Sequence, residues 1–532
     1  MRFATLLRRL ANARLLPASG TGAVRPDRAL PEATRDTEID HIADDSRQVG
    51  PGGLFVAVRG HETDGHQFIE QAVENGAAAV LYEEVPEGNG GSIESADLPP
   101  AEAAAGDGAA VRSAGEAAFV RSCDTRAALA EAAAAFHGDP SRELKLAGIT
   151  GTNGKTTTAY LVRHTLRALG EQTALIGTME TDLGTGAKGS ALTTPGPVQL
   201  QRMLRTAVQN GCTAGAIEVS SHALDQERTR ATRFAVGIFT NLTPEHLDYH
   251  GTLEKYRAAK KRLFDALPAG SVALYNADDS AGEAVAADAK ARTISFGESG
   301  DVRLEIVENH LDGLHLRLDG AAPRAFRLVG RFNAYNLAAA YGAARAMGYR
   351  QDETLDALAE APPVPGRFEQ LRFSENEGEG ERAVVVDYAH TPDALENVLQ
   401  ALRNLKDEAA TLWCVFGCGG DRDRTKRPAM GRAAERLADR VIVTSDNPRT
   451  EDPGAIIEEI RGGLKTPKDV LFVEDRRAAI REAARQSQNG DVILIAGKGH
   501  ETYQIVGTDR QPFDDRKEAK KSFGNAPAGG NT

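Results

Sequence analysis

The stretch that most constrains the fold is residues 147–170, AGITGTNGKTTTAYLVRHTLRALG. A short apolar strand, LKLAGI, leads into the turn TGTNG. The helix that follows carries apolar residues on one face, at Ala159, Val162, Leu166 and Leu169. Gly170 then suits the end of this helix. Because backbone N–H groups and the positive end of a helix hold phosphate in such turns, the stretch predicts a nucleotide-binding loop in an α/β domain.

The spacing of this loop is unusual. In the common pattern G-x-x-x-x-G-K-[ST], the first glycine would fall at Ile149. Gly151 and Gly154 would still let the backbone approach a phosphate closely. Lys155 would supply a charge for the outer phosphates, and Thr156 a hydroxyl for Mg²⁺. The alternative, a chance glycine turn, leaves the strand–turn–helix context unexplained.

Strands and helices alternate in two series. The first series has the strand-like runs TALIG, AGAIEV, AVGIFTN and SVALYN. The second follows APPVPGRFE at 361–369 and runs AVVVDYAHTP, LWCVFGCGGDRD, RVIVTSDNPRTED, VLFVED and VILIAGKGHE. Such alternation predicts an α/β fold with parallel sheets, whose ligands bind at the carboxyl ends of the strands. We predict three domains, 1–142, 143–362 and 363–532, the last two facing each other across a cleft.

One segment does not fit any domain core. Residues 84–118 are rich in Gly, Ala, Pro, Ser and Glu, a composition that buries little apolar area. We predict a disordered surface insertion there, dispensable for activity.

Charge and cysteine content narrow the class of protein. The net charge of -13 argues against non-specific nucleic-acid binding, although local arginines can still hold anionic substrates. No apolar run approaches the ~20 residues of a membrane span, and arginines interrupt the apolar residues of the first segment, unlike a secretory signal. The four cysteines, two of them spaced C-x-x-x-C, predict free thiols. We expect a cytoplasmic monomer with small-molecule partners, no nucleic acid and no membrane span.

The loop GTNGKTTT resembles the ATP loop of the Mur ligases, which add amino acids in peptidoglycan synthesis. The resemblance extends from DDSRQV at 44 to FDDRKEA at 513, and several separate motifs agree. It implies a UDP-binding domain, a central ATPase domain and a Rossmann-like third domain. Within the family, the chain is similar to ligases that add the third residue of the peptide. The implied reaction passes the γ-phosphate of ATP to a substrate carboxylate, and an amine then displaces the phosphate.

The resemblance also implies the ATP contacts and the metal ligands. The ATP contacts are Gly151, Thr152, Asn153, Gly154, Lys155, Thr156, Thr157, Asn336, Arg367 and Asp387, with Lys155 also catalytic. The Mg²⁺ ligands are Thr156, Glu218 in AIEVSSH, His246 in NLTPEHLDYHG, and a carbamate on Lys260. A carboxylate at a strand end, as at Glu218, is costly unless it meets a metal or a cation. The alternatives are a polar core residue for His246 and a solvated surface residue for Arg367.

Two positions near the implied metal site, Glu245 and Lys260, need separate comment. The family usually has Asp where this chain has Glu245, which affects the geometry around the metal. Taken alone, Lys260 in YRAAKKRLF is typical of a solvated helix face. Only the resemblance implies a lysine carbamylated by CO₂. The carbamate is physically sensible, because Mg²⁺ repels an ammonium and attracts an anionic carbamate.

The remaining motifs match the two other substrates of such a ligase. The residues that resemble contacts to UDP-N-acetylmuramoyl-L-alanyl-D-glutamate are Ser46, Thr193, Thr194, Ser220, Gln226 and Arg228. Those that resemble contacts to meso-diaminopimelate are Arg422, Asp446, Asn447, Pro448, Arg449, Gly497 and Glu501. Arg449 can grip the second carboxylate of diaminopimelate, which lysine lacks, and Glu501 suits its distal ammonium.

Three other functions remain open at this point. The first is the same reaction with L-lysine, which Arg449 argues against. The second is folylpolyglutamate synthesis, which leaves DNPR at 446–449 and the first domain unexplained. The third is a nucleotide-dependent binding protein that makes no bond, which the metal ligands and the second α/β series disfavour.

Overall fold

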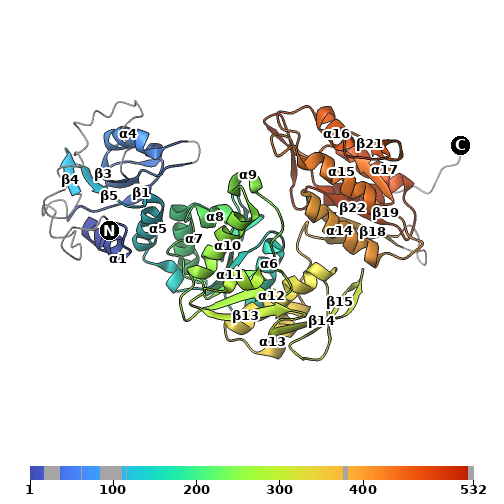
Figure 1. Cartoon of the computed structure of the whole chain (residues 1–532), viewed down its shortest axis with the longest axis horizontal. Helices are drawn as coiled ribbons and strands as arrows, with labels where there is room; N and C mark the ends of the chain where they lie inside the picture. The colour runs from blue at the N-terminus through green and yellow to red at the C-terminus, as the bar shows by residue number, and fades with distance from the viewer. Residues whose placement is uncertain (17–35, 61–62, 84–110, 115–116, 375–380, 525–532) are drawn as a thin grey trace.

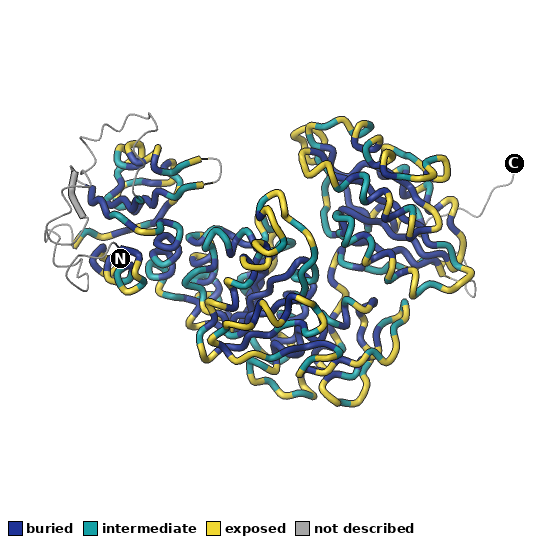
Figure 2. Tube along the Cα trace, viewed as in Figure 1, coloured by how far each residue is buried: buried dark blue, intermediate teal, exposed yellow. Residues whose placement is uncertain are grey.

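The computed structural model describes residues 1–16, 36–60, 63–83, 111–114, 117–374 and 381–524. They form three α/β units in chain order, each built on its own main sheet (Figure 1). Buried residues concentrate in the strands and in the helix faces that cover them, as Figure 2 shows. The predicted three-domain α/β fold is confirmed, whereas the boundaries after 142 and 362 stay predictions.

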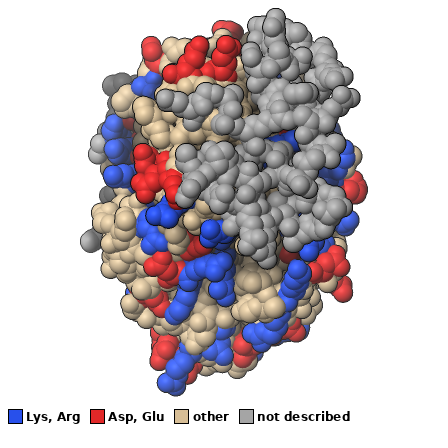
Figure 3. Space-filling view, turned by 90° about the vertical axis from the view of Figure 1, so that its left-hand side faces the viewer, with Lys and Arg blue, Asp and Glu red and all other residues tan. Residues whose placement is uncertain are grey.

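The amino-terminal unit has a five-stranded sheet in the order β1-β2-β3-β5-β4, parallel except for β4. Its elements are α1 (Phe3–Asn12), β1 (His41–Ala43), η1 (Ser46–Gln48), β2 (Gly53–Val56), η2 (Gly65–Phe68), α4 (Ile69–Glu74), β3 (Ala77–Tyr82), β4 (Val111–Ala114), β5 (Ala117–Arg121), α5 (Thr125–Phe136) and η4 (Pro140–Arg142). On the face of the molecule shown in Figure 3, acidic and basic side chains are interspersed among uncharged ones.

The prediction of a disordered insertion at 84–118 was wrong at its carboxyl end. Residues 111–114 form β4 and pair antiparallel with β5, which begins at Ala117. The composition misled because small residues such as Ala117 and Ala118 still fit a buried strand beside β3. The rest of the predicted insertion, 84–110 and 115–116, lies outside the described residues.

The central unit has an eleven-stranded sheet in the order β16-β15-β14-β13-β12-β11-β6-β10-β7-β8-β9. Its strands are β6 (Lys145–Thr150), β7 (Thr173–Ile176), β8 (Glu180–Asp182), β9 (Ala187–Gly189), β10 (Ala214–Glu218), β11 (Val236–Phe239), β12 (Val272–Asn276), β13 (Arg292–Gly297), β14 (Val302–His310), β15 (Gly313–Leu318) and β16 (Arg324–Phe326). Its helices are α6 (Lys155–Ala168), α7 (Pro197–Gln209), α8 (Ser221–Asp225), α9 (Leu247–His250), α10 (Leu253–Asp265), α11 (Gly282–Ala286), α12 (Arg331–Ala346) and α13 (Gln351–Ala359).

Strand order in the central sheet decides where the site forms. β6 lies between β10 and β11, and all three are parallel. Their carboxyl ends therefore meet at one edge, which brings together the glycine loop after β6, Glu218 at the end of β10 and the segment 240–246 after β11.

The carboxyl-terminal unit has a six-stranded sheet in the order β17-β18-β22-β19-β20-β21, parallel except for β17, and a separate hairpin, β23–β24. Its strands are β17 (Glu369–Phe373), β18 (Arg382–Asp387), β19 (Leu412–Phe416), β20 (Arg440–Val443), β21 (Leu471–Phe472), β22 (Val492–Ala496), β23 (Tyr503–Val506) and β24 (Asp509–Pro512). Its helices are α14 (Pro392–Leu405), α15 (Lys426–Leu437), α16 (Pro453–Arg461), η5 (Pro467–Asp469), α17 (Arg476–Gln486) and α18 (Asp515–Gly524).

Candidate active site

The glycine loop before α6 is held in a shape that side chains would disturb. Gly151 and Gly154 have φ of 151° and 85°. A Cβ on Gly151 would lie 1.8 Å from Thr240 Oγ1, and one on Gly154 would lie 2.5 Å from Asn336 Oδ1. The loop is therefore close-packed on both sides, and only glycine fits these two positions.

Two side chains of the loop point into the site. Lys155 Nζ donates to the carbonyl oxygens of Gly151 and Thr152 at 2.8 and 2.7 Å. Burial lowers the pKa of Lys155, while Glu245 and Glu218 oppose that shift. Thr156 Oγ1 donates to Glu218 Oε2 at 2.9 Å, so the hydroxyl and the carboxylate lie side by side.

Glu218 provides the chemistry of a cation site. Its side chain is fully buried and accepts hydrogen bonds from Thr156 Oγ1, Thr178 N and Thr178 Oγ1. Lys155 is the nearby cation whose charge interacts with Glu218, and a buried carboxylate is costly without such a partner. Hydroxyl and carboxylate oxygens are ligands that Mg²⁺ prefers, so these residues fit the ion.

His246 and Glu245 lie on the neighbouring loop. His246 caps α9 with a left-handed φ of 56°, and its ring packs against those of His222 and Tyr256. Burial works to raise the pKa of Glu245, yet Lys155 and other nearby cations hold it below its usual value. Among the described residues, no three His, Cys, Asp or Glu side chains form a metal-holding group. The structure places Thr156 beside Glu218 and Lys260 against Gly151 O, so the complete set of Mg²⁺ ligands stays a prediction.

The residue pattern predicts that Lys260 lies on a solvated helix face, and this prediction is wrong. The side chain is only 1% exposed, and its Nζ donates to Gly151 O at 2.8 Å and lies 4.2 Å from the centre of the Tyr256 ring. Lys260 lies in α10, on the side that turns toward the glycine loop. Burial, and then the charge of Lys155, hold the pKa of Lys260 well below its usual value.

The third unit reaches the glycine loop, as the sequence predicted for two facing domains. Arg367 Nη2 donates to Thr156 Oγ1 at 3.2 Å, so the arginine is not a solvated surface residue. Asp393, at the start of α14, accepts from Asn153 Nδ2 and from Thr243 Oγ1, both at 3.0 Å. Three residues of the central unit are thereby tied to the carboxyl-terminal unit.

The other predicted ATP contacts make hydrogen bonds within one unit or the other. Asn336 Oδ1 accepts from Thr158 Oγ1 at 3.2 Å, and Thr157 is buried in α6. Asp387 accepts from the backbone N–H of Phe368 and Ala389, both at 2.7 Å. Burial raises the pKa of Asp387, and Arg367 opposes that shift. Asp387 thus fixes the turn that carries Arg367.

Four of the predicted dipeptide contacts form one hydrogen-bonded cluster. Thr194 Oγ1 donates to Glu218 O at 2.8 Å and accepts from Ser220 N at 3.1 Å. Arg228 donates to Gln226 Oε1 through Nε and Nη2, and to Thr194 O through Nη1.

The other two predicted dipeptide contacts lie outside this cluster. Thr193 lies beside it, with Oγ1 3.0 Å from Thr178 Oγ1. Ser46 lies in the amino-terminal unit, where it donates to Gln71 Oε1 at 2.7 Å.

The predicted amino-acid pocket lies where β20 and β22 end. Asn447 Nδ2 donates to Glu501 Oε2 at 2.9 Å. Arg449 has a left-handed φ of 53°, and its Nη1 donates to Gly420 O at 2.7 Å. Gly497, with φ of 117°, leaves room for Asp446, whose Oδ2 would lie 3.2 Å from an added Cβ.

Two further predicted contacts surround this pocket. Pro448 is buried in the same loop as Arg449. Arg422 is exposed and donates to Asp421 O at 3.1 Å, so the structure does not bring it into contact with the other predicted residues among those it describes.

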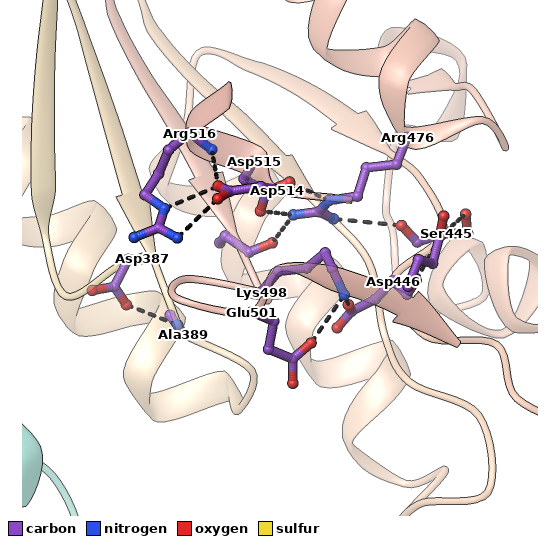
Figure 4. A network of polar contacts seen from close by, with 12 residues as sticks. Asp387, Ala389, Ser445, Asp446, Arg476, Lys498, Glu501, Asp514, Asp515 and Arg516 are labelled. Carbon is purple, nitrogen blue, oxygen red and sulfur yellow. Dashed lines mark hydrogen bonds and ion pairs between the residues drawn. The ribbon is translucent and has the colours of Figure 1, made fainter. Parts of the chain in front are cut away.

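Sequence reasoning missed two residues that the structure places in these contacts. Asp393 links the two units, and Lys498 lies between Asp446, Asn447 and Glu501; Figure 4 shows it beside the two carboxylates. Lys498 stands in the motif AGKGHE, and Asp393 comes one residue after AVVVDYAHTP; each lies a few residues beyond the end of a strand. Their position after a strand end was the available signal.

Comparison with known families and proteins matches three consecutive segments of the chain. Residues 38–137 match the model described as Mur ligase family, catalytic domain; 149–344 match Mur ligase middle domain; and 366–499 match Mur ligase, glutamate ligase domain. Separately, no helix among the described residues is long and apolar enough to cross a membrane.

Known proteins match over almost the full length. A UDP-N-acetylmuramoyl-L-alanyl-D-glutamate–2,6-diaminopimelate ligase of Bacteroides fragilis is 41% identical, covering 92% of this chain and 96% of its own. The ligase of the same name from Geobacter metallireducens is 43% identical, covering 91% and 94%. A solved structure of a ligase of this name has a TM-score of 0.64 and 32% identity, covering 93% and 97%. A Mycobacterium tuberculosis folylpolyglutamate synthase complexed with ADP shares the fold, with a TM-score of 0.54, 20% identity and coverage of 70% and 91%.

The identity to these ligases extends through all three units, and the three matched segments occupy most of the chain. The chain belongs to the Mur ligase family.

Proposed function

We propose that this protein is an ATP-dependent ligase that joins meso-2,6-diaminopimelate to the D-glutamate of UDP-N-acetylmuramoyl-L-alanyl-D-glutamate. The observation that carries the proposal is the identity of 41–43% to ligases of this name over more than nine-tenths of the chain. The geometry supports it, because a glycine loop, a buried carboxylate and an arginine from the third unit meet at one sheet edge.

The chain's own residues suit phosphoryl transfer from ATP. The backbone of the glycine loop and the start of α6 hold the phosphates, and Lys155 neutralises their charge. Arg367 brings a second cation from the other unit, beside Thr156. Transfer of the γ-phosphate to the glutamate carboxylate gives an acyl phosphate and ADP. Contact between the two units keeps water from that labile intermediate.

Thr156, Glu218, His246 and a carbamate on Lys260 would hold Mg²⁺, which stabilises the negative charge of the phosphates. Only the neutral form of an amine attacks CO₂, so a lowered pKa at Lys260 favours the modification. A bond forms between Nζ and the CO₂ carbon, and the amine releases a proton. The resulting anion replaces a cation that would otherwise repel the metal.

The amine of diaminopimelate then attacks the acyl carbon, and phosphate leaves. Arg449 binds the distal carboxylate of this substrate, and Glu501 its distal ammonium. Thr194, Ser220, Gln226 and Arg228 orient the dipeptide near Glu218 through their hydrogen-bonded cluster.

Lysine offers no partner for Arg449, so the pocket discriminates against it. Because the substrates are ATP and a UDP-linked precursor, and the four thiols are free, we place the reaction in the cytoplasm. We also propose that the protein acts as a monomer.

The test is phosphate release by the purified protein with ATP, Mg²⁺ and UDP-N-acetylmuramoyl-L-alanyl-D-glutamate. Three reactions receive meso-diaminopimelate, L-lysine or neither. We expect release only with diaminopimelate. Release with lysine would contradict the role of Arg449, and nucleotide binding without release in any reaction would favour a binding protein.

A further inference from the structure

Lys498 is completely buried among the residues that are predicted to bind diaminopimelate. It stands between Gly497 and Glu501 in AGKGHE, at 0% exposure. Its Nζ lies 2.9 Å from Asn447 Oδ1, 2.9 Å from Glu501 Oε2 and 3.4 Å from Asp446 Oδ1. Figure 4 shows its amino group pointing between the two carboxylates.

These contacts give each N–H donor of the ammonium an oxygen partner. A lysine has three N–H donors and no acceptor, and three oxygens surround this one. With no exposed surface and no spare donor, Lys498 cannot bind a substrate group itself. Any effect on the substrate must pass through Asp446, Asn447 or Glu501.

Its partners leave one carboxylate oxygen available. Glu501 Oε2 takes the bonds from Lys498 and from Asn447 Nδ2, whereas Oε1 receives no hydrogen bond from the described residues. Lys498 also separates the negative charges of Asp446 and Glu501, which would otherwise repel each other across the pocket.

The same contacts fix the wall of the pocket. Asn447 Oδ1 accepts from Lys498 and also from Ile505 N, at 3.0 Å, and Lys498 Nζ lies 5.8 Å from the centre of the Tyr503 ring. Arg449 N donates to Ile505 O at 3.1 Å. Backbone hydrogen bonds thus join the hairpin β23–β24 to the loop of Arg449, and Lys498 meets the hairpin through Asn447 Oδ1 and the Tyr503 ring.

We infer that Lys498 is a positioning residue that sets the specificity for an amino acid with a distal ammonium, by holding Glu501 with Oε1 aimed at that group. The inference rests on the proposed function. It predicts a selective effect, because Arg449, which we propose binds the distal carboxylate, donates to Gly420 O and has no contact with Lys498 among the described residues.

The experiment combines one substitution with two substrates. Lys498→Met keeps an unbranched apolar side chain as far as Cε and removes the charged amino group. L-2-aminopimelate keeps the attacking amine and both carboxylates of diaminopimelate but lacks the distal ammonium. We expect the KM for diaminopimelate to rise about 10-fold or more, because a charged hydrogen bond loses its alignment. The KM for aminopimelate should change less than about 2-fold, since the lost partner is absent there.

A matched control separates positioning from general loss of stability. Arg382→Met removes another buried cation of the same unit, which donates to Ala484 O at 3.1 Å and lies outside the pocket. It should lower the melting temperature and leave both KM values unchanged. If Lys498→Met does not fold, Lys498→Gln can replace it, because it keeps a hydrogen-bond donor and removes the charge. Its KM should also rise for diaminopimelate and stay nearly unchanged for aminopimelate.

Equal increases in both KM values, or an unchanged KM for diaminopimelate, would overturn the inference and leave the proposed function standing. Absence of turnover of diaminopimelate by the unmodified protein would overturn the proposed function, and this inference with it.

Discussion

At the scale of single residues, Lys260 shows that the local sequence pattern does not always predict whether a side chain is buried. Its neighbours in α10 are charged, so the pattern alone predicts a solvated position, yet the side chain is buried against Gly151. Lys261, one residue later, has the surface role, pairing with Asp265 and Asp288. The resemblance to a family identified Lys260 because it uses information about the whole fold, which local hydrophobicity lacks.

Lys260→Ala should lower turnover about 100-fold or more, because the site would lose the carbamate that we propose as an anionic ligand where charge develops. Phosphate release at saturating substrates measures it, and thermal melting checks the fold. Lys261→Ala is the matched control and should stay within about 2-fold of the original rate, since surface ion pairs contribute little. Adding acetate or formate should partly restore Lys260→Ala by supplying carboxylate oxygens. Near-normal turnover without rescue would contradict the carbamate.

The buried His500 leads us to predict that the free energy of unfolding depends on pH. Burial, with the nearby charges of Arg367, Arg516 and Lys498, lowers the pKa of this histidine to about 3, and its ring packs 5.1 Å from that of Tyr388. The unfolded chain binds the proton more readily, so unfolding becomes easier as the pH falls from about 6.5 toward 3.

The melting temperature should therefore fall between pH 7.5 and pH 5, and His500→Phe should make this fall smaller while keeping the ring contact. His310→Phe is the control, because this side chain is 68% exposed and is solvated in both states. The same pH dependence in His500→Phe as in the unmodified protein would show that other groups control it.

At the scale of elements, the glycine loop was the most predictable part of the fold. A strand, a turn with two glycines and an amphipathic helix are local features, and the structure has β6, the loop and α6 at those residues. What the sequence could not show is why those glycines are needed. The atoms that exclude a side chain, Thr240 Oγ1 and Asn336 Oδ1, come from distant parts of the chain.

Gly154→Ala should raise the KM for ATP about 10-fold or more, because the loop must move away from Asn336 and misplace its N–H donors. Gly170→Ala is a matched control: its φ is 93°, but no atom lies within 4 Å of the added Cβ. It should cost about 1 kcal/mol of stability through the left-handed backbone alone, without changing that KM. Equal KM values in the two variants would refute the packing argument.

At the scale of the whole molecule, the sequence predicted two facing domains but not the contacts between them. Arg367 was expected near ATP from the family resemblance, whereas Asp393 was missed, because its position after a strand end does not show which residue it contacts. Contacts between units depend on how rigid bodies dock, and no hydrophobic period or turn motif encodes that arrangement. The division into sheets was therefore predictable, and the residues that join them were not.

We predict that Asp393 helps to hold the central and carboxyl-terminal units together. Its Oδ2 accepts from Asn153 and Thr243 of the central unit and from Asn397 of its own helix. Asp393→Ala removes the acceptor for two of the hydrogen bonds between the units, so an open arrangement becomes more populated. We expect the KM for ATP to rise about 5-fold, which corresponds to about 1 kcal/mol. The radius of gyration from small-angle X-ray scattering should increase in solution.

A control on the same helix separates this effect from loss of α14. Glu396→Ala removes an ion pair with Arg436 that lies within the carboxyl-terminal unit. It should leave the KM for ATP and the radius of gyration unchanged. Saturating ATP should return Asp393→Ala to the compact form, because ligand that contacts both units favours the closed arrangement. If Asp393→Ala keeps both the original KM and the original radius, Arg367 and the packing between the units suffice for closure, and Asp393 is not the residue that holds them.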